Sequence, residues 1–245
     1  MRVTTTDLQN AFGKYLALVE QEDIIVVKNG KSVAKLIHYT EPDFFIVHEE
    51  SKNYQSTRKI SYEEYMALVE SSDQRYELID GEVYFLASPS FRHQIVVNEI
   101  AWHFQNYFRG KPCRPLTAPL DIKLFGLATK FEEDPNVVQP DIMVICDQDK
   151  VTADNKYEGT PTLLVEVLSP STRGKDLAIK LNLYLKSGVS EYWIVDPDMK
   201  TVVQYTFTKD REIESMQTFG EKETVNSSYF TGLTVPMPEV FTEVG

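Results

Sequence analysis

The sequence is poor in cysteine, in histidine and in long hydrophobic runs. Its 245 residues include two cysteines and four histidines, and the isolated Cys113 and Cys146 are too few to predict a zinc cluster or a disulfide framework. Apolar stretches such as 162–168 are far too short to cross a bilayer. The opening segment MRVTTTDLQN lacks the apolar core of a secretory signal. These absences predict a cytoplasmic protein without a membrane span.

An excess of basic residues is missing as well. Lys and Arg number 25 against 37 Asp and Glu, which gives a formal net charge of −12, and most of the excess acid lies after Arg58. Non-specific affinity for nucleic acid comes mainly from basic side chains that neutralise phosphates, so the composition argues against a simple nucleic-acid binder. Clustered carboxylates can still reach a phosphate through a divalent metal ion, and the charge therefore leaves a metal-dependent nuclease open.

The first forty residues predict a small unit of one helix and one hairpin. Thr6 is a candidate N-cap, and the apolar side chains that follow it recur at helical spacing. The apolar stretch 24–27, the Asn29-Gly30 pair and the stretch 32–37 predict two strands joined by a two-residue turn. A helix and a hairpin bury little surface, so this unit is expected to need a partner, most simply a second copy of itself.

The run VTTTDLQNAFGKYLALVEQEDIIVVKNGKSVAKLI resembles the prevent-host-death (Phd/YefM) antitoxin family. The resemblance covers Met1 to about Tyr39 and rests on the Thr-rich start, the Leu and Phe of the helix, the NG hairpin and the Val-Ala-x-Leu ending. It implies a domain over residues 1–42 that forms a homodimer, binds operator DNA near Arg2 and has a toxin-like partner. A dimerisation module without DNA contact fits the same residues equally well, because few basic residues lie near that face.

Residues 43–59 form a predicted linker, after which the pattern changes. Ser61 and Glu64 predict a capping box at the start of a helix. The sequence then predicts a hairpin at 75–86 around Asp80-Gly81, a long helix at 91–108, strands at 116–124, 137–146 and 162–168, a helix at 176–186 that stops at Gly188, and strands at 192–195 and 202–205. A helix between two strands implies a parallel pair, so residues 60–245 are expected to form an α/β (α+β) domain.

Asp141 and Glu166 each interrupt a predicted strand that is otherwise mainly apolar. Glu166 interrupts TLLVEVL, whose apolar residues on both alternating faces predict a central strand covered on both sides, and Asp141 interrupts VVQPDIMVIC. A buried carboxylate is costly unless a metal ion, a cation or strong hydrogen bonds compensate it, and paired oxygen ligands suit Mg²⁺ or Mn²⁺. The pattern favours a metal site made by both acids over two structural carboxylates bonded to Arg or to a helix N-terminus.

The helix predicted after Glu166 carries three polar residues on one face. Asp176, Lys180 and Tyr184 follow one another at intervals of four. A lysine there can orient an attacking water or stabilise charge that develops on a phosphate. The residues alone favour a simpler interpretation, an Asp176–Lys180 ion pair on the surface, which contributes little to stability.

A second resemblance favours the catalytic role of Lys180 over the surface ion pair. The stretches SYEEYMALVE, YELIDGEVYFLASPSFRHQ, QPDIMVI, LLVEVLSPSTRGKDLAIKLNLYLKSGV and EYWIVDP are similar to the Uma-type family of restriction-endonuclease-like proteins, over roughly residues 60 to 207. That family belongs to the PD-(D/E)XK superfamily, so the resemblance implies a mixed sheet flanked by helices. It also implies metal-binding roles for Asp141, which follows Pro140, and for Glu166. Leu168 stands where the superfamily has its lysine, and the resemblance implies that Lys180 has taken over that role.

Further polar residues are weaker candidates for supporting such a site. Glu77 and Glu82 flank the Asp80-Gly81 turn, Asp121 lies in the predicted strand 116–124, and His93 begins the long helix. Simpler roles compete with each of these, since a histidine at a helix start often caps or packs and an acid on an edge strand is usually solvated. Gln139 and Tyr184 are further residues that are expected to line the site.

The sequence therefore predicts a Mg²⁺- or Mn²⁺-dependent endonuclease that hydrolyses DNA, with Asp141, Glu166 and Lys180 as its catalytic residues. A second hypothesis is a non-catalytic DNA-binding or regulatory protein with a degenerate nuclease domain, which the presence of Leu168 and the negative charge favour. A third is a fused toxin–antitoxin pair, in which the N-terminal unit restrains the nuclease.

Overall fold

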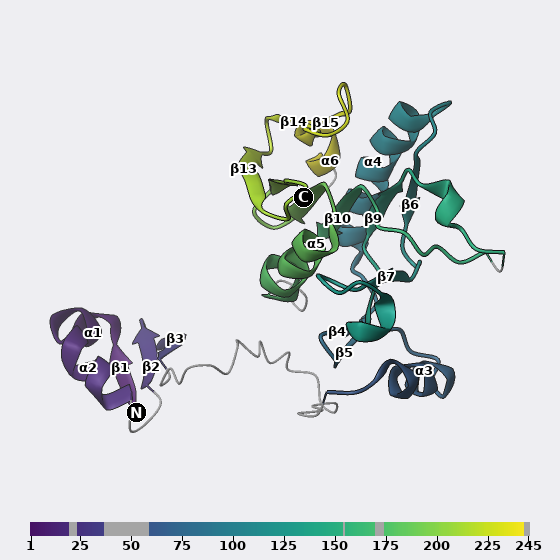
Figure 1. The fold of residues 1–245 in the computed structure, drawn as a ribbon. Coiled ribbons are helices and arrows are strands. Elements are labelled where there is room, and N and C mark those ends of the chain that lie inside the picture. Colours follow the sequence, from purple (N-terminus) through teal and green to yellow (C-terminus); the bar gives the residue numbers. More distant parts are fainter. Residues whose placement is uncertain (20–23, 37–58, 154, 170–173, 243–245) are drawn as a thin grey trace. The chain divides into compact units, whose positions relative to one another are not determined.

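A computed structural model gives the structure of this chain and describes residues 1–19, 24–36, 59–153, 155–169 and 174–242. The chain divides into two compact units, residues 1–48 and residues 49–245, and each is described by itself (Figure 1). The predicted linker at 43–59 lies almost wholly outside the described residues and stays a prediction. No helix in the described part of the chain is both long enough and apolar enough to cross a membrane.

The N-terminal unit is a three-stranded sheet with two short helices. Its elements are β1 (Arg2–Thr4), α1 (Thr5–Asn10), α2 (Phe12–Val19), β2 (Ile24–Lys28) and β3 (Lys31–Leu36). The strands lie in the order β1-β2-β3, with β1 parallel to β2. The expected hairpin is confirmed, and Asn29 and Gly30 both take the positive φ that its turn requires.

The N-cap of α1 is Thr4, so the prediction of Thr6 is wrong. The Thr4 hydroxyl accepts a hydrogen bond from the backbone N–H of Asp7 at 3.1 Å, and the Asp7 carboxylate accepts one from the Thr4 N–H. The threonine run offers several hydroxyls, and the one three residues before an acid completes a capping box.

The second unit contains a six-stranded mixed sheet and a four-stranded antiparallel sheet. The larger sheet is made of β6 (Arg114–Thr117), β9 (Ile142–Ile145), β10 (Leu163–Val167), β11 (Glu191–Asp196), β12 (Thr201–Phe207) and β13 (Ile213–Gly220), in the order β13-β12-β11-β10-β9-β6. The smaller is made of β4 (Tyr76–Ile79), β5 (Glu82–Phe85), β7 (Ile122–Leu124) and β8 (Asn136–Val138), in the order β5-β4-β8-β7. The strands β10 and β11 are parallel, as the helix between them predicted.

Helices cover these sheets. They are α3 (Tyr62–Glu70), α4 (Phe91–Phe108), the 3₁₀ turns η1 (Phe131–Glu133) and η2 (Gln148–Lys150), the π-helical turn η3 (Lys175–Lys180), α5 (Leu181–Ser187) and α6 (Met237–Phe241). The capping box of Ser61 and Glu64 is confirmed, with hydrogen bonds of 3.2 and 2.9 Å. The bounds predicted for α4 are confirmed, and α5 ends at Gly188, which has a φ of 85°.

The strand β10 is buried on both faces, as its apolar pattern predicted. Leu163, Val165 and Val167 belong to the hydrophobic core that contains the buried face of α4. Leu164 belongs to the opposite core, which contains Leu183 and Tyr184 of α5. Since side chains alternate along a strand, Glu166 lies on the same face as Leu164, toward α5.

Two predicted strands are each broken in the structure. The stretch 137–146 divides into β8 and β9, and the stretch 116–124 divides into β6 and β7, so that each pair passes from the smaller sheet to the larger one or back. Pro119 and Pro140 lie at the two breaks, and proline cannot donate to a sheet ladder. Asp141 consequently lies just before β9 and Asp121 just before β7, so the prediction that both lie within strands is wrong.

The two cysteines form a disulfide, which the sequence analysis did not expect. Arg114 of β6 pairs with Ile145 of β9, so Cys113 and Cys146 are the next residues across from each other, and their sulfur atoms are bonded. Their separation of 33 residues in the sequence conceals this proximity. A cytoplasmic location stays a prediction.

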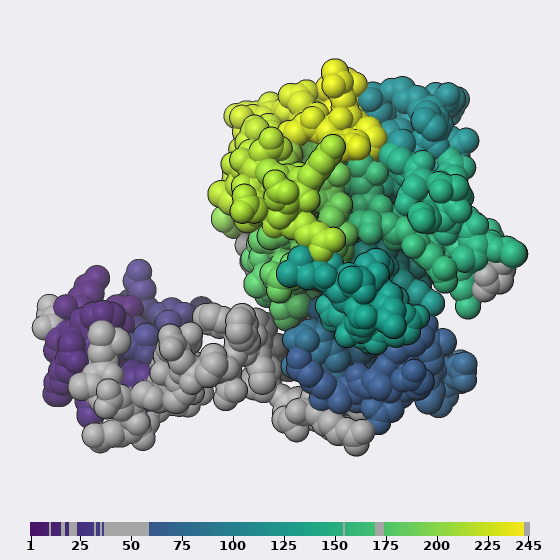
Figure 2. Space-filling view, viewed as in Figure 1, coloured from purple at the N-terminus to yellow at the C-terminus, as the bar shows by residue number. Residues whose placement is uncertain are grey.

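The buried carboxylate of Glu191 joins a C-terminal hairpin to the larger sheet by hydrogen bonds. The hairpin consists of β14 (Thr224–Asn226) and β15 (Thr234–Pro236), and with α6 it lies beside α4 at the surface (Figure 2). Glu191 is fully buried and accepts hydrogen bonds from Trp193 Nε1 and Gln204 Nε2, both at 2.6 Å. It also accepts from Ser227 Oγ at 2.6 Å and from the backbone N–H of Tyr229 at 3.0 Å.

Replacing Glu191 by Gln is expected to lower the free energy of unfolding by about 2 kcal/mol, because an amide cannot accept from all of these donors and leaves at least one unpaired. Urea unfolding followed by Trp fluorescence would measure the change. The exposed Glu214 of β13 provides the control, since Glu214→Gln should change stability by less than about 0.5 kcal/mol. Equal stability of the two variants would contradict the structural role of Glu191.

Candidate active site

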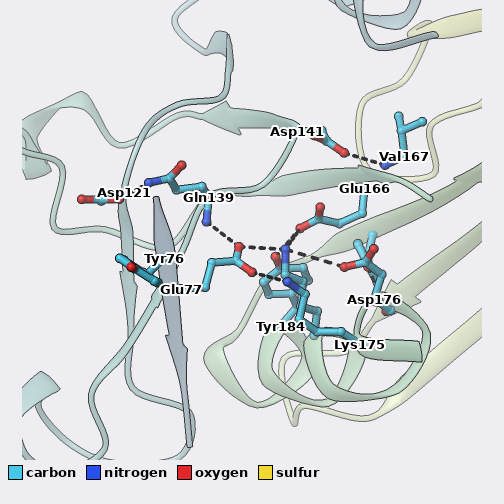
Figure 3. A network of polar contacts seen from close by, with 12 residues as sticks. Tyr76, Glu77, Asp121, Gln139, Asp141, Glu166, Val167, Lys175, Asp176 and Tyr184 are labelled. Atoms are coloured by element: carbon cyan, nitrogen blue, oxygen red, sulfur yellow. Dashed lines mark hydrogen bonds and ion pairs between the residues drawn. The ribbon is translucent and has the colours of Figure 1, made fainter. Parts of the chain in front are cut away.

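Charged side chains from both sheets and from one helix meet in the second unit. Glu77 comes from β4, Glu166 from β10, and Asp141 from the segment between β8 and β9. The helical segment η3–α5 adds Lys175, Asp176 and Tyr184 (Figure 3), and it also contributes Lys180. Four of the predicted residues, Glu77, Glu166, Lys180 and Tyr184, are in direct contact.

Lys180 bridges two carboxylates at the centre of this cluster. Its Nζ lies 2.8 Å from Glu166 Oε1 and 2.9 Å from Glu77 Oε1, and 3.7 Å from Asp176 Oδ1. The residue is 2% exposed. The interpretation of Lys180 as one half of a surface ion pair with Asp176 is therefore wrong, because the apolar spacing of the helix did not show that its polar face turns into the protein.

A π-helical turn explains why so many charges share one face. In an α-helix, residues five apart lie about 140° apart around the axis, which would direct Lys175 away from Lys180. The segment η3 is a π-helix, which is closed by i→i+5 hydrogen bonds. Residues five apart, such as Lys175 and Lys180, therefore lie on nearly the same face of it. Lys175, Asp176 and Lys180 are all buried as a result, and Tyr184 continues the same face one α-helical turn later.

Asp141 lies opposite Glu166, just before the neighbouring strand β9. Ile142 pairs with Val165, and continuing this antiparallel register by one residue brings Asp141 across from Glu166. The Asp141 Oδ2 atom accepts a hydrogen bond of 2.8 Å from the backbone N–H of Val167, and His93 Nε2 lies 3.2 Å from the same oxygen. Figure 3 shows the hydrogen bond between Asp141 and Val167 at the edge of the cluster.

Both carboxylate oxygens of Glu77 are paired. Its Oε2 atom lies 2.8 Å from Lys175 Nζ, and its Oε1 atom accepts from the backbone N–H of Gln139 at 2.8 Å as well as contacting Lys180. Burial alone would raise the pKa of this carboxyl group, but Lys180, Lys175 and the Gln139 N–H together lower the pKa of Glu77 to about 2. Glu77 is therefore ionised at neutral pH.

Glu166 differs from Glu77 in its charge environment. Burial is the largest effect on the group, and it outweighs the attraction of Lys180; with the neighbouring Asp176 and Asp141 it raises the pKa of Glu166 to about 8. The carboxylates of Glu166 and Glu77 raise the pKa of Lys180 well above its usual range despite burial, so this lysine stays charged. Burial and Glu166 likewise raise the pKa of Tyr184, whose hydroxyl donates to Glu166 Oε1 at 2.7 Å.

The pKa of His93 is also shifted. Burial lowers its pKa, but the hydrogen bond and the charge of Asp141 outweigh that effect and raise the pKa of His93 above its ordinary value. His93 is 8% exposed and lies near the N-terminus of α4. The structure thus brings this supporting candidate to Asp141 rather than leaving it as a helix cap, a role that the Ser90 hydroxyl fills.

Two carboxylates of the cluster, those of Asp141 and Glu166, could hold a divalent metal ion. No set of three His, Cys, Asp or Glu side chains in the described part of the chain is arranged to hold a metal by itself. The hydrogen bonds to Asp141 and Glu166 engage one oxygen of each carboxylate, Oδ2 and Oε1. The other oxygens remain for a cation such as Mg²⁺, which typically takes one or two carboxylates and completes its shell with water and phosphate oxygens.

A buried acceptor nearby also lacks a partner. Among the described residues, Gln139 Oε1 is buried without a hydrogen bond, while Gln139 Nε2 donates to Asp121 Oδ1 at 2.8 Å. A buried oxygen without a donor is costly, and water or an ion commonly satisfies it. Asp121 is exposed, and it joins the cluster only through Gln139.

The remaining candidates lie elsewhere. Glu82 is exposed on β5, where it accepts a hydrogen bond from the Tyr84 hydroxyl. Arg2 is exposed on β1 of the N-terminal unit, and its contact with DNA stays a prediction. Lys175 was not among the predicted site residues, because α-helical spacing separates it from Lys180 and the π-turn brings the two together.

Comparison with known proteins assigns the second unit to a family. The Uma2 family, described as "Putative restriction endonuclease", matches residues 62–238, which is more than half of the chain. The chain belongs to the Uma2 family. The family match begins after the N-terminal unit, so it leaves the resemblance to the Phd/YefM antitoxins a prediction.

Two relatives come from Synechocystis sp. (strain ATCC 27184 / PCC 6803 / Kazusa). The uncharacterized protein slr1290 is 30% identical over 126 residues, which are 51% of this chain and 62% of the relative, so the match spans less than two thirds of that protein. The uncharacterized protein sll1609 is 26% identical over 176 residues, or 71% of this chain and 96% of the relative. The names of these two proteins state no activity.

A solved structure shows the same fold. It is the crystal structure of "a putative nuclease belonging to DUF820" from Anabaena variabilis ATCC 29413, and it matches with a TM-score of 0.61 at 20% identity. The match covers 76% of this chain and 99% of that one. The expected restriction-endonuclease-like fold, a mixed sheet flanked by helices, is thereby confirmed for this Uma2 protein.

Proposed function

We propose that this Uma2 protein is a Mg²⁺- or Mn²⁺-dependent endonuclease that hydrolyses DNA phosphodiester bonds. One observation carries the proposal: Asp141 and Glu166 lie opposite each other, and hydrogen bonds engage one oxygen of each carboxylate, Oδ2 and Oε1. Asp141 is partly exposed, so a cation can reach the pair from solvent. A divalent cation would bind the remaining oxygen of each carboxylate. The family description and the fold of the Anabaena variabilis protein support a nuclease.

The proposed site assigns a role to each neighbouring group. Asp141 and Glu166 would hold the metal ion, which would act as a Lewis acid toward the phosphate and the attacking water. The Val167 N–H and His93 fix the carboxylate of Asp141, and the hydroxyl of Tyr184 fixes that of Glu166. Lys180 is a charged donor beside Glu166 that can orient the attacking water or stabilise charge on the phosphate.

Removal of the metal is expected to abolish the activity. The purified chain should cut plasmid or single-stranded DNA with Mg²⁺ or Mn²⁺, stop in EDTA and recover when Mn²⁺ is added in excess, because two carboxylates alone cannot activate water. Gel electrophoresis of the products would measure this. Mn²⁺ binding by calorimetry without cleavage would retain the metal site and indicate a different substrate. If the chain neither binds Mn²⁺ nor cleaves DNA, the result would favour a non-catalytic, regulatory role.

A further inference from the structure

Lys175 is a buried charge to which the proposed mechanism gives no task. The residue is 8% exposed, its Nζ lies 2.8 Å from Glu77 Oε2, and it lies 5.3 Å from the centre of the Tyr84 ring. Burying an ammonium group is costly unless it is well paired. Lys175 nevertheless reaches this position through a π-turn, a feature that occurs frequently at functional sites.

The contacts of Glu77 indicate what Lys175 does. The Oε1 atom of Glu77 faces Lys180 and the Gln139 N–H, and its Oε2 atom faces Lys175. With both oxygens engaged, Glu77 is poorly placed to bind a metal ion. It is instead a fixed anion between two lysines, and it belongs to a different sheet from Glu166.

Lys180 is consequently shared between two acids of different roles. One of them, Glu166, is the proposed metal ligand, and the other, Glu77, is not. If Lys180 were the sole cation beside Glu77, the Glu77 carboxylate would attract the Lys180 ammonium group strongly and keep it away from the reacting phosphate. Lys175 supplies a second cation to the same carboxylate and so weakens the attraction between Glu77 and Lys180.

We propose that Lys175 is a positioning residue of the nuclease site, which neutralises Glu77 and so leaves Lys180 available to the reacting phosphate or water. The proposal rests on the proposed function of the site. It places Lys175 behind Glu77 rather than in contact with the substrate, in agreement with its ion pair to the Glu77 oxygen that Lys180 does not use.

The first test compares Lys175→Met with Lys175→Arg and with Lys186→Met, a change of an exposed lysine on α5. Lys175→Met is expected to lower kcat about 10- to 100-fold with KM changed less than about threefold, since the loss acts on Lys180 after the substrate has bound. Lys175→Arg keeps the charge and should stay within about fivefold of wild type, and Lys186→Met should match wild type. Affinity for Mn²⁺, measured by calorimetry, should not fall in Lys175→Met.

The second test is the double variant Glu77→Gln with Lys175→Met. If Lys175 acts through Glu77, removing the anion as well frees Lys180 and should restore kcat at least about fivefold over Lys175→Met. If Lys175 touches the substrate itself, the double variant stays as slow as the single one and the proposal is overturned. The double variant also carries the test if Lys175→Met fails to fold, because it removes the buried anion that has lost one of its two cations. A kcat within about fivefold of wild type supports the proposal, and a slower one overturns it.

The outcomes separate this inference from the function on which it rests. Wild-type chain that neither cleaves DNA nor binds Mn²⁺ overturns both. Wild-type chain that cleaves, together with Lys175→Met that cleaves equally fast, overturns the positioning role alone. Urea unfolding of each folded variant identifies a loss of kcat that merely follows a loss of native protein.

Discussion

Replacing Glu166 by Gln is expected to reduce metal-dependent cleavage by about 10³-fold. The substitution keeps the shape of the side chain but removes a proposed metal ligand, and losing several kcal/mol of transition-state stabilisation corresponds to a factor of this size. Affinity for Mn²⁺ should fall with it. The measurement is initial cleavage rate against metal concentration, together with calorimetric titration of Mn²⁺ into both proteins.

The same variant is expected to fold normally, which makes the test clean. Burial disfavours the charged form of Glu166 and raises its pKa to about 8, so a neutral amide suits the position, while Lys180 keeps Glu77 as its partner. The free energy of unfolding should therefore fall by no more than about 1 kcal/mol. Glu214→Gln, at an exposed strand position, is the matched control. Unchanged Mn²⁺ affinity in Glu166→Gln would falsify the assignment of Glu166 as a ligand.

Much of the fold could be predicted from local patterns. The spacing of apolar residues predicted α4 with its bounds, the capping box of Ser61 and Glu64 predicted the start of α3, and Gly188 marked the end of α5. The apolar residues on both faces of 162–168 predicted a central strand, and β10 lies between β9 and β11. These signals are contained within single elements, so the rest of the chain was not needed to interpret them.

The failures concern features that depend on distant parts of the chain. The sequence predicted one strand over 137–146, but the structure breaks this stretch at Pro140, because its halves pair with different sheets. The disulfide of Cys113 and Cys146 depends on the register of β6 with β9. Neither the partner strand nor the register can be obtained from the spacing of residues within one segment.

The candidate site shows the same division. The interruption of apolar strands by Asp141 and Glu166 indicated both acids, since a buried charge is conspicuous in such a context. The position of Lys180 between Glu166 and Glu77 was not predictable from the residues alone, because an α-helical spacing of four from Asp176 fits an exposed pair equally well. The π-turn, which buries this face and adds Lys175, has no simple sequence signal.

Replacing Glu77 by Gln is expected to destabilise the fold by about 3 kcal/mol at pH 7. The change breaks two buried ion pairs, with Lys175 and with Lys180, and leaves both ammonium groups with fewer anions. Removal of one partner from a buried pair is among the largest effects of a single substitution. Urea unfolding of the variant and of the wild-type chain, followed by fluorescence of the buried Trp193, would measure the difference.

The effect of Glu77→Gln should depend on pH in one direction. The folded chain holds the pKa of Glu77 at about 2, below its ordinary value of 4.5, so the carboxylate stabilises the fold fully above pH 4.5 and loses this contribution as pH falls toward 2. The difference between wild type and variant should therefore be constant from pH 7 to about pH 5 and then shrink. Glu82→Gln, at an exposed position of the same hairpin, should show neither the loss nor the pH dependence. If the difference in free energy of unfolding between wild type and Glu77→Gln stayed constant down to pH 3, the shape of Glu77 and not its charge would stabilise the fold. That result would also contradict the role of Lys175, which requires Glu77 to be an anion.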